Sequence, residues 1–175
     1  MCAEVHKNDT RIAPDIPYRQ VVGSLMYLAM ATRPDITFAV NAASQHLENP
    51  RPIHWNASKR IIKYVKGTCN YGLYFPTDRK NHVHTFSDAD YAGDTETRRS
   101  TTGLLVKLGD STVTWRSLKQ RTVALSTTEA EYVAASTTVK EVIWTKALLD
   151  ELAVPSEKTS LYVDNVSAVK LIKNP

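Results

Sequence analysis

Three stretches of the sequence carry carboxylates where elements of secondary structure are expected to begin or end. In residues 85–94, an alternating apolar run leads into three acids and a glycine, the pattern of a strand that ends on acidic side chains. Residues 126–132 match a helix start with two glutamates, and residues 161–165 match a strand that ends on an aspartate. Carboxylates that converge repel one another unless a cation lies between them, and oxygen ligands suit a hard divalent cation. The sequence therefore predicts a divalent metal site.

Asp88, Glu131 and Asp164 are the side chains that we expect to meet at this site. In two-metal phosphoryl transfer, cations roughly 4 Å apart activate a water and neutralise the leaving oxygen, and they need acids arranged in this way. Each acid also has an ordinary alternative. A surface Asp-x-Asp is often a solvated turn, and a glutamate at a helix N-terminus is often a capping residue. Glu129 stays open as a ligand beside Glu131.

The elements that would position these acids form a mixed α/β chain. A helical period predicts helices over residues 18–32, 36–48 and 53–67, followed by a strand over residues 71–75. From residue 82 the period changes to two, and strands are expected over residues 82–87, 103–108, 111–117 and 121–125. A helix over residues 127–153, a strand over residues 160–163 and a helix over residues 165–173 complete the chain. A strand–helix–strand step predicts a right-handed parallel crossover, so antiparallel strands are joined by a parallel one.

Basic residues are unevenly distributed along the chain, whose formal net charge is +4. Residues 1–80 hold eleven Lys and Arg against six Asp and Glu, whereas residues 81–175 hold eleven against twelve. Within residues 98–121, six basic residues face a single acid. A basic belt beside an acidic cluster suits a polyanion, although a solvated surface explains the charge equally well. The residues of the belt that we expect to bind nucleic acid are Arg98, Arg99, Arg116, Lys119 and Arg121.

A second group of basic residues lies on one face of the helix expected over residues 53–67. Its members are Lys59, Arg60, Lys63 and Lys66. This face could lie along a nucleic-acid backbone, but a solvated helix face is the interpretation that the sequence alone favours.

Several classes of protein are disfavoured by composition. The two cysteines, Cys2 and Cys69, are far apart and indicate neither a disulfide framework nor a zinc site. The N-terminus lacks the apolar region of a signal peptide, and the longest apolar run, Leu25 to Ala31, is too short to span a bilayer. We therefore expect an intracellular protein, cytoplasmic or nuclear, that is not secreted and has no membrane partner.

Several segments of the chain resemble the Pol polyprotein of copia-type LTR retrotransposons. They comprise residues 18–28, 32–36, 59–68, 71–73, 87–94, 100–103, 125–132 and 164–168. The resemblance runs from about Pro17 to the end of the chain. It implies that residues 17–80 are a helical connection region downstream of a reverse-transcriptase palm. It also implies that residues 81–175 are a ribonuclease H-like mixed sheet, incomplete at the C-terminus. Residues 1–16, which are polar, are expected to form a flexible arm.

The resemblance also assigns roles to the acids. A ribonuclease H domain cleaves the RNA strand of an RNA–DNA hybrid with two Mg²⁺ (or Mn²⁺) ions. Asp88 matches the first metal-binding aspartate, and Asp164 matches the aspartate at the end of the fourth strand. Glu131 matches the helix glutamate better than Glu129 does. The partners implied are an RNA–DNA hybrid and the rest of a Pol polyprotein.

Two departures from the family pattern leave enzymatic activity open. The family uses a fourth acid with a nearby histidine, and both would lie beyond Pro175; the polymerase palm is also not present. The alternative is a catalytically inactive, truncated remnant that only binds nucleic acid or has no activity. The stretch from Tyr162 to Asn165 is not a polymerase Tyr-x-Asp-Asp turn, because its last residue is an amide and a helical pattern follows.

Overall fold

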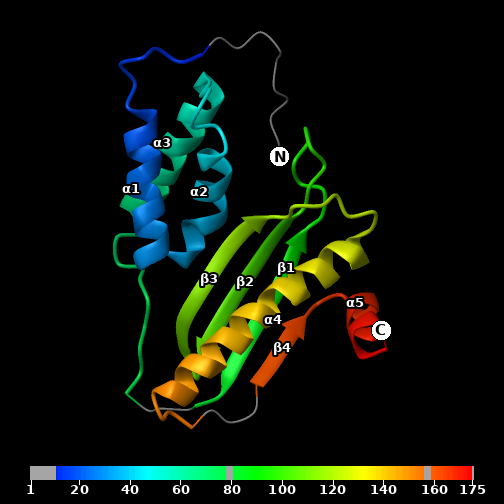
Figure 1. Cartoon of the computed structure of the whole chain (residues 1–175). Helices are drawn as coiled ribbons and strands as arrows, with labels where there is room; N and C mark the ends of the chain where they lie inside the picture. The colour runs from blue at the N-terminus through cyan, green and yellow to red at the C-terminus, as the bar shows by residue number, and fades with distance from the viewer. Residues whose placement is uncertain (1–10, 78–80, 156–158, 175) are drawn as a thin grey trace. The chain divides into compact units, whose positions relative to one another are not determined.

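The chain forms two compact units, Met1–Gly72 and Leu73–Pro175. The computed structural model describes residues 11–77, 81–155 and 159–174 (Figure 1). The first unit is helical and the second combines a sheet with helices, which agrees with the expected α/β class. Each unit contains a hydrophobic cluster of its own.

The described residues of the first unit, 11–72, form three α-helices and one short 3-10 helix. These are α1 (Tyr18–Ala31), η1 (Pro34–Ile36), α2 (Thr37–Ser44) and α3 (Pro52–Gly67). The apolar stripes of the three α-helices meet in a core that contains Leu25, Val40 and Ile61. A second cluster includes the buried Tyr18, whose hydroxyl donates a 2.8 Å hydrogen bond to the carbonyl oxygen of Ala43.

The segments that flank these helices differ from expectation. Residues 1–10 of the expected arm lie outside the described residues, whereas residues 11–16 pack on the helices. There Ile12 is buried and its N–H donates to the carbonyl oxygen of Pro50 at 3.0 Å. The strand predicted over residues 71–75 is wrong: this segment is irregular, and its aromatic side chains are exposed. Alternation of apolar residues makes a strand only where a neighbouring edge accepts its backbone hydrogen bonds.

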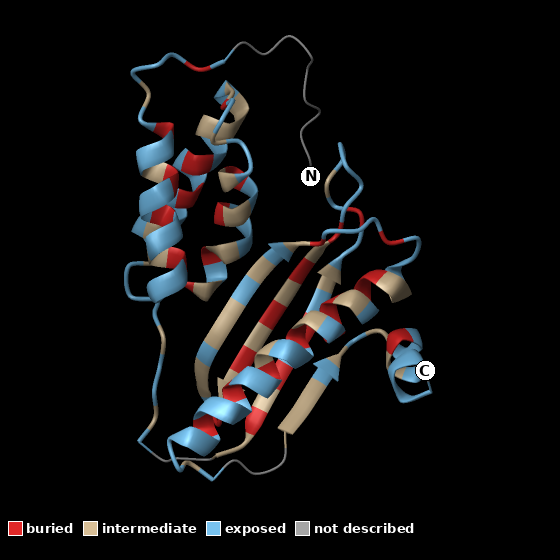
Figure 2. Cartoon of the chain, viewed as in Figure 1, coloured by how far each residue is buried: buried red, intermediate tan, exposed pale blue. Residues whose placement is uncertain are grey.

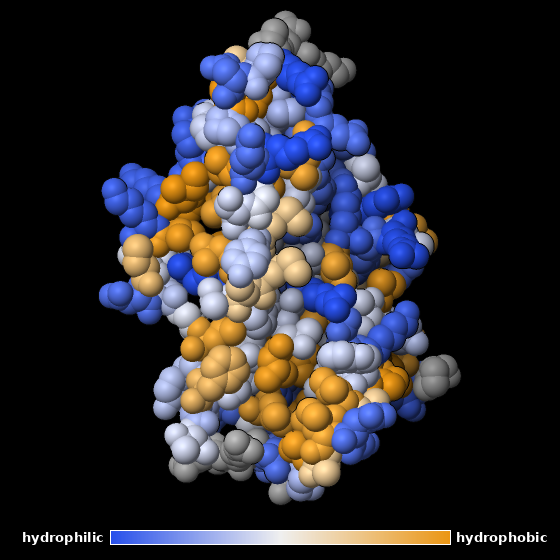
Figure 3. Space-filling model, turned by 60° about the vertical axis from the view of Figure 1, so that its left-hand side comes forward, coloured by the Kyte–Doolittle hydropathy of each residue, from blue (hydrophilic) through white to orange (hydrophobic). Residues whose placement is uncertain are grey.

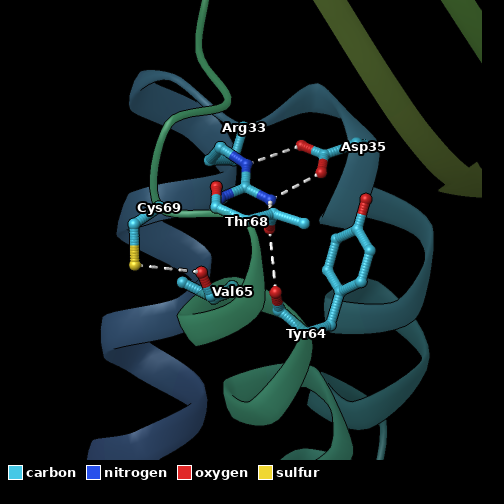
Figure 4. A network of polar contacts seen from close by, with 6 residues as sticks. All are labelled: Arg33, Asp35, Tyr64, Val65, Thr68 and Cys69. Atoms are coloured by element: carbon cyan, nitrogen blue, oxygen red, sulfur yellow. Dashed lines mark hydrogen bonds and ion pairs between the residues drawn. The ribbon is translucent and has the colours of Figure 1, made fainter.

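A buried arginine joins the end of α1 to the end of α3 (Figure 4). The guanidinium of Arg33 donates to both carboxylate oxygens of Asp35, at 2.9 and 2.7 Å, and to the backbone and side-chain oxygens of Thr68. The rings of Tyr64 and Tyr71 lie 5.6 and 5.8 Å from its central carbon. The hydrogen bonds from Arg33 lower the pKa of Asp35 below its usual value, so the pair stays ionised.

In the second unit, the residues that the structure describes form a four-stranded sheet and two helices. Its elements are β1 (Val83–Asp90), β2 (Thr101–Leu108), β3 (Ser111–Lys119), α4 (Thr127–Glu151), β4 (Thr159–Val163) and α5 (Val166–Lys173). The strand order is β3-β2-β1-β4. The β1–β2 and β2–β3 pairs are antiparallel, and β1–β4 is parallel. The expected mixed sheet, with antiparallel strands first and a parallel one after, is therefore confirmed.

Helix α4 covers one face of this sheet. Figure 2 marks buried residues on β1, β2 and α4, the elements that contact one another. Val83, Leu104, Val106 and Leu149 form the core there. Alternate residues of β1 are buried beneath α4, which leaves Phe86 and Asp88 on the other face. This alternation decides which side chains of β1 can reach solvent.

Two predictions about strands in the second unit are wrong: the end of the first strand, and the existence of a strand over residues 121–125. Strand β1 runs on to Asp90, so Asp88 lies inside the strand and not after its end. The strand expected over residues 121–125 is not formed; this segment is a loop that ends at Ser126, the N-cap of α4. The chain leaves the sheet at Gln120, whose side chain is buried and bonded to two other elements.

Large apolar side chains remain exposed on both units, among them Tyr27, Met30, Leu125, Ile143 and Trp144. Figure 3 shows hydrophobic residues gathered in several groups on the face that it displays. Groups of this kind are typical of interaction surfaces. Among the described residues, no helix combines the length and the hydropathy that a bilayer-spanning segment requires.

Candidate metal centre

Three acids from three elements of the second unit come together. Asp88 lies on β1, Glu131 on α4, and Asp164 directly after β4. One carboxylate oxygen of each lies within 4.8 Å of those of the other two. The strand register explains two of them: Ser87 of β1 pairs with Val163 of β4, so the next residue of each strand is an acid at the same level of the sheet.

Glu131 is the buried member of this triad, with 6% of its surface exposed. Its Oε1 accepts a 3.1 Å hydrogen bond from the backbone N–H of Ala89, which ties α4 to β1. Its Oε2 is buried and has no hydrogen-bond partner among the described residues. Burial raises the pKa of Glu131, the bond from Ala89 opposes this, and the charges of Asp164 and Asp88 raise it further. None of the three acids forms an ion pair with a described residue, so the negative charge of the triad is not compensated within the part of the chain that the structure describes.

Glu129 precedes Glu131 by two residues on α4 and has a different partner. The Oγ of Ser126 accepts a hydrogen bond from the N–H of Glu129 at 3.1 Å. The carboxylate of Glu129 in turn accepts one from the N–H of Leu125 at 2.7 Å. These reciprocal bonds cap the start of α4. Of the two glutamates left open by the sequence, the structure groups Glu131 with Asp88 and Asp164.

Asp90, the other acid of β1, is directed toward the turn that follows the strand. Its carboxylate lies so close to Gly93 that a Cβ at that position would overlap it. The neighbouring Ala92 has a φ of 51°, in the left-handed region. Gly93 thus allows the turn to close on Asp90, which does not belong to the triad.

Gln120 holds the start of α4 against the sheet. Its Nε2 donates to Oγ1 of Thr102 on β2 at 3.1 Å and to the carbonyl oxygen of Ala130 at 3.0 Å. Its backbone N–H donates to the carbonyl oxygen of Ser100. Because Ala130 precedes Glu131, these bonds fix the position along β1 at which the carboxylate of Glu131 contacts the strand. Sequence reasoning missed Gln120, since a single polar residue after a strand carries no distinguishing pattern.

The basic belt predicted for nucleic acid is partly neutralised within the second unit. Arg116 on β3 forms an ion pair of 3.3 Å with Glu141 on α4. Lys119 forms an ion pair with Asp94. Burial alone would raise the pKa of Asp94, but hydrogen bonds from Lys119 and Thr97 outweigh it and hold that pKa far below its usual value.

The other three belt residues remain open to solvent. Arg98, Arg99 and Arg121 are exposed and form no ion pair with any residue that the structure describes. They are the belt residues whose charge is available to an external anion.

The triad fits a hard divalent cation. Three carboxylates supply the oxygen ligands that Mg²⁺ and Mn²⁺ prefer, and the orphaned Oε2 of Glu131 lacks the partner that a cation would provide. Opposite ligands of Mg²⁺ lie about 4.2 Å apart, because each bond is ~2.1 Å long. The ligand atoms here lie within 4.8 Å of one another. Asp88 and Asp164 are exposed, so their side chains can move the short distance that brings these oxygens to the spacing of Mg²⁺ ligands.

Among proteins of known sequence, the chain is similar to two retrotransposon polyproteins. It is 43% identical over 167 residues to the retrovirus-related Pol polyprotein from transposon RE2 of Arabidopsis thaliana. It is 45% identical over 159 residues to that from transposon TNT 1-94 of Nicotiana tabacum. These alignments cover 95% and 91% of the chain but only 11% and 12% of the two polyproteins. The chain thus spans about a tenth of their length.

A shorter relative is the secreted RxLR effector protein 161 of Plasmopara viticola. It is 49% identical over 130 residues, which are 74% of this chain and 92% of that protein. No protein-family profile matches the chain. No solved structure matches it either.

Proposed function

Because the chain belongs to the family of copia-type retrotransposon Pol polyproteins, we propose that its second unit is a ribonuclease H-like domain. Its substrate is the RNA strand of an RNA–DNA hybrid, and its cofactor is Mg²⁺ or Mn²⁺. The observation that carries this proposal is the convergence of Asp88, Glu131 and Asp164 at one end of a mixed sheet. The first unit is then the helical region that connects this domain to the preceding part of the polyprotein.

The three acids hold unequal positions in this proposal. Glu131 is fixed by the N–H of Ala89 and by burial, so it is the rigid ligand. Asp88 and Asp164 are exposed and face the solvent from which a substrate phosphate approaches. A bound divalent cation supplies an activated water and neutralises charge on the leaving oxygen. Arg98, Arg99 and Arg121 are the belt residues that contact the substrate backbone.

Cleavage of a labelled RNA–DNA hybrid by the full chain tests this proposal. The RNA strand carries a 5′ label, the buffer contains Mg²⁺, and the matched control is Asp88→Asn, which keeps the shape of the side chain and removes its charge. The wild-type chain is expected to shorten the RNA strand, and the variant and an EDTA-treated sample are expected to leave it intact. Duplex DNA of the same sequence is expected to stay intact as well.

Two results contradict the enzymatic function. Equal cleavage by the wild type and Asp88→Asn means that the activity does not depend on the triad. No cleavage by either means that the chain is the binding-only or inactive remnant. Binding of the uncut hybrid then separates those two alternatives.

A further inference from the structure

Helix α3 of the first unit presents a row of cations to solvent. We call Lys59, Arg60, Lys63 and Lys66 the α3 cationic face; all four are exposed. With 3.6 residues per turn, the three lysines fall within about 60° of the helix circumference. The opposite side of the helix carries Ser58 and Ile61, which are buried against the core of the unit. The packing of α3 therefore fixes the direction in which the lysines point.

Among the described residues of the first unit, no acid neutralises the charge of this face. Helix α3 contains no acidic residue, and residues 11–72 hold eight Lys and Arg against three Asp and Glu. One of the three acids, Asp35, is already engaged by Arg33. None of the four cations forms an ion pair with a described residue, and Lys59 instead lies 5.8 Å from the centre of the Trp55 ring.

The α3 cationic face contrasts with the belt predicted in the second unit. There Arg116 and Lys119 are each held by an acid of the same unit. The charge of each of these two residues is already partly offset by a neighbouring carboxylate, so it adds less to the local positive potential than an unpaired cation does. The larger group of unpaired cations on a single rigid element is therefore on α3.

The spacing of the lysines suits a nucleic-acid backbone. With a rise of 1.5 Å per residue, Lys59 and Lys66 are about 10.5 Å apart along the helix. A nucleic-acid strand carries one phosphate per ~3.4 Å of helix axis, so the row faces about three phosphates. Tyr64, which is 45% exposed, flanks Arg60 on the same helix and offers a ring for contact with the sugars of the backbone.

An anionic membrane is a weaker match for this surface. A helix that binds a bilayer surface places large apolar side chains on its exposed side. The apolar stripe of α3 is instead buried in the unit, and Ile62, 41% exposed, is the aliphatic residue beside the lysines. The surface is charged without an apolar anchor, as phosphate-backbone binding requires.

We propose that the α3 cationic face is a second nucleic-acid-binding site, which grips the phosphate backbone independently of the metal centre. Lys59, Lys63 and Lys66 make the phosphate contacts, and Arg60 lies at the edge of the site. The site does not read sequence, because it touches the backbone alone. It also does not need a metal ion, so its binding is measured without one.

A salt titration of binding tests this site. The probe is a fluorescein-labelled RNA–DNA hybrid, the buffer contains EDTA, and the full chain is compared with the triple variant K59Q/K63Q/K66Q. Because glutamine is a good helix former, α3 is expected to persist in the variant. Each lost phosphate contact lowers the slope of log K against log salt by ~0.9, so the slope is expected to fall by about 2.7, with roughly tenfold or greater loss of affinity at 0.1 M salt.

Matched variants separate a site from an effect of net charge. K140Q/K146Q/K170Q removes three exposed lysines of the second unit and is expected to leave the slope unchanged. K59R/K63R/K66R keeps the charge and is expected to bind as the wild type does, which shows that positive charge at these positions carries the binding. Far-UV circular dichroism and thermal unfolding that match the wild type exclude loss of folding in K59Q/K63Q/K66Q. Equal losses in the two glutamine triples overturn the proposal. Binding of the wild type to phosphatidylserine vesicles with none to the hybrid overturns it as well.

Because this assay contains EDTA, it does not depend on cleavage. Failure of the α3 site leaves the cleavage result unaffected, and failure of cleavage leaves the α3 site unaffected.

Discussion

At the scale of single residues, Glu131 illustrates the energetic cost of a group of acids that could hold a metal ion. The side chain is buried, one of its oxygens has no described partner, and two further acids are close by. Such a group stabilises the folded chain only when a cation is bound. The atoms that could bind a cation are thus the same atoms whose charge is destabilising without one.

Glu131→Gln is expected to raise the free energy of unfolding in EDTA at pH 7. The Tm should rise with it, by a few degrees. The amide keeps an oxygen for the N–H of Ala89 and removes the charge. Because the folded-state pKa of Glu131 is raised, the penalty of its ionised form is present above that pKa and disappears as the pH falls below the unfolded value. The difference between variant and wild type should therefore close toward pH 4.

Added Mg²⁺ should reverse the order of stability. At about one hundred times its dissociation constant, a ligand stabilises the folded state by ~2.7 kcal/mol, and only the wild type has the site. Thermal unfolding with Mg²⁺ and with EDTA measures both effects. A variant that is less stable than the wild type in EDTA would contradict the view that the triad is uncompensated.

At the scale of elements, the site depends on where α4 starts. Gln120 links β2, the end of β3 and the first turn of α4, and Glu131 follows directly from that contact. Ser126 and Glu129 cap the same helix end. The carboxylate that enters the triad is therefore positioned by residues that do not touch it.

Gln120→Leu is expected to cost about 1–3 kcal/mol of stability, because the carbonyl of Ala130 and the hydroxyl of Thr102 lose their buried donor. It should also weaken Mg²⁺ binding by about tenfold, the lower end of what supporting contacts contribute to metal affinity. Isothermal titration with Mg²⁺, below the unfolding temperature of the variant, separates the two effects. Unchanged Mg²⁺ affinity with reduced stability would show that Gln120 does not position Glu131.

Local periodicity predicted most elements but not their ends. The long helix and the mixed sheet follow from patterns of 3.6 and 2 residues, which are carried by many side chains. The absent strands at residues 71–75 and 121–125 have the same local pattern as real strands but no neighbouring edge to pair with. The separation of Glu131 from Glu129 depended on hydrogen bonds to Ala89 and Leu125, which no local pattern encodes.

At the scale of the whole molecule, the chain contains two units, each with its own core. Each unit also has a side chain whose replacement should change stability in a known direction. In the first, Asp35 neutralises the buried Arg33. In the second, Thr85 is fully buried and its hydroxyl has no hydrogen-bond partner among the described residues.

Differential scanning calorimetry of Asp35→Ala and Thr85→Val is expected to resolve two transitions. Asp35→Ala leaves the buried charge of Arg33 unpaired. It should reduce the free energy of unfolding of the first unit by about 3 kcal/mol and so lower the temperature of one transition. Thr85→Val replaces an unsatisfied hydroxyl with a methyl group of similar size. It should increase the free energy of unfolding of the second unit by about 1 kcal/mol and so raise the temperature of the other transition. A single transition that both variants shift would show that the two units unfold together.

The unequal lengths of β1 and β4 have a consequence for how this region can diverge. Strand β4 stops at Val163, opposite Ser87, while β1 continues for three more residues. Because successive side chains of a strand point to opposite faces, inserting one residue into β4 would turn Asp164 away from Asp88. The number of residues in β4 is therefore constrained by the distance between the carboxylates of Asp88 and Asp164.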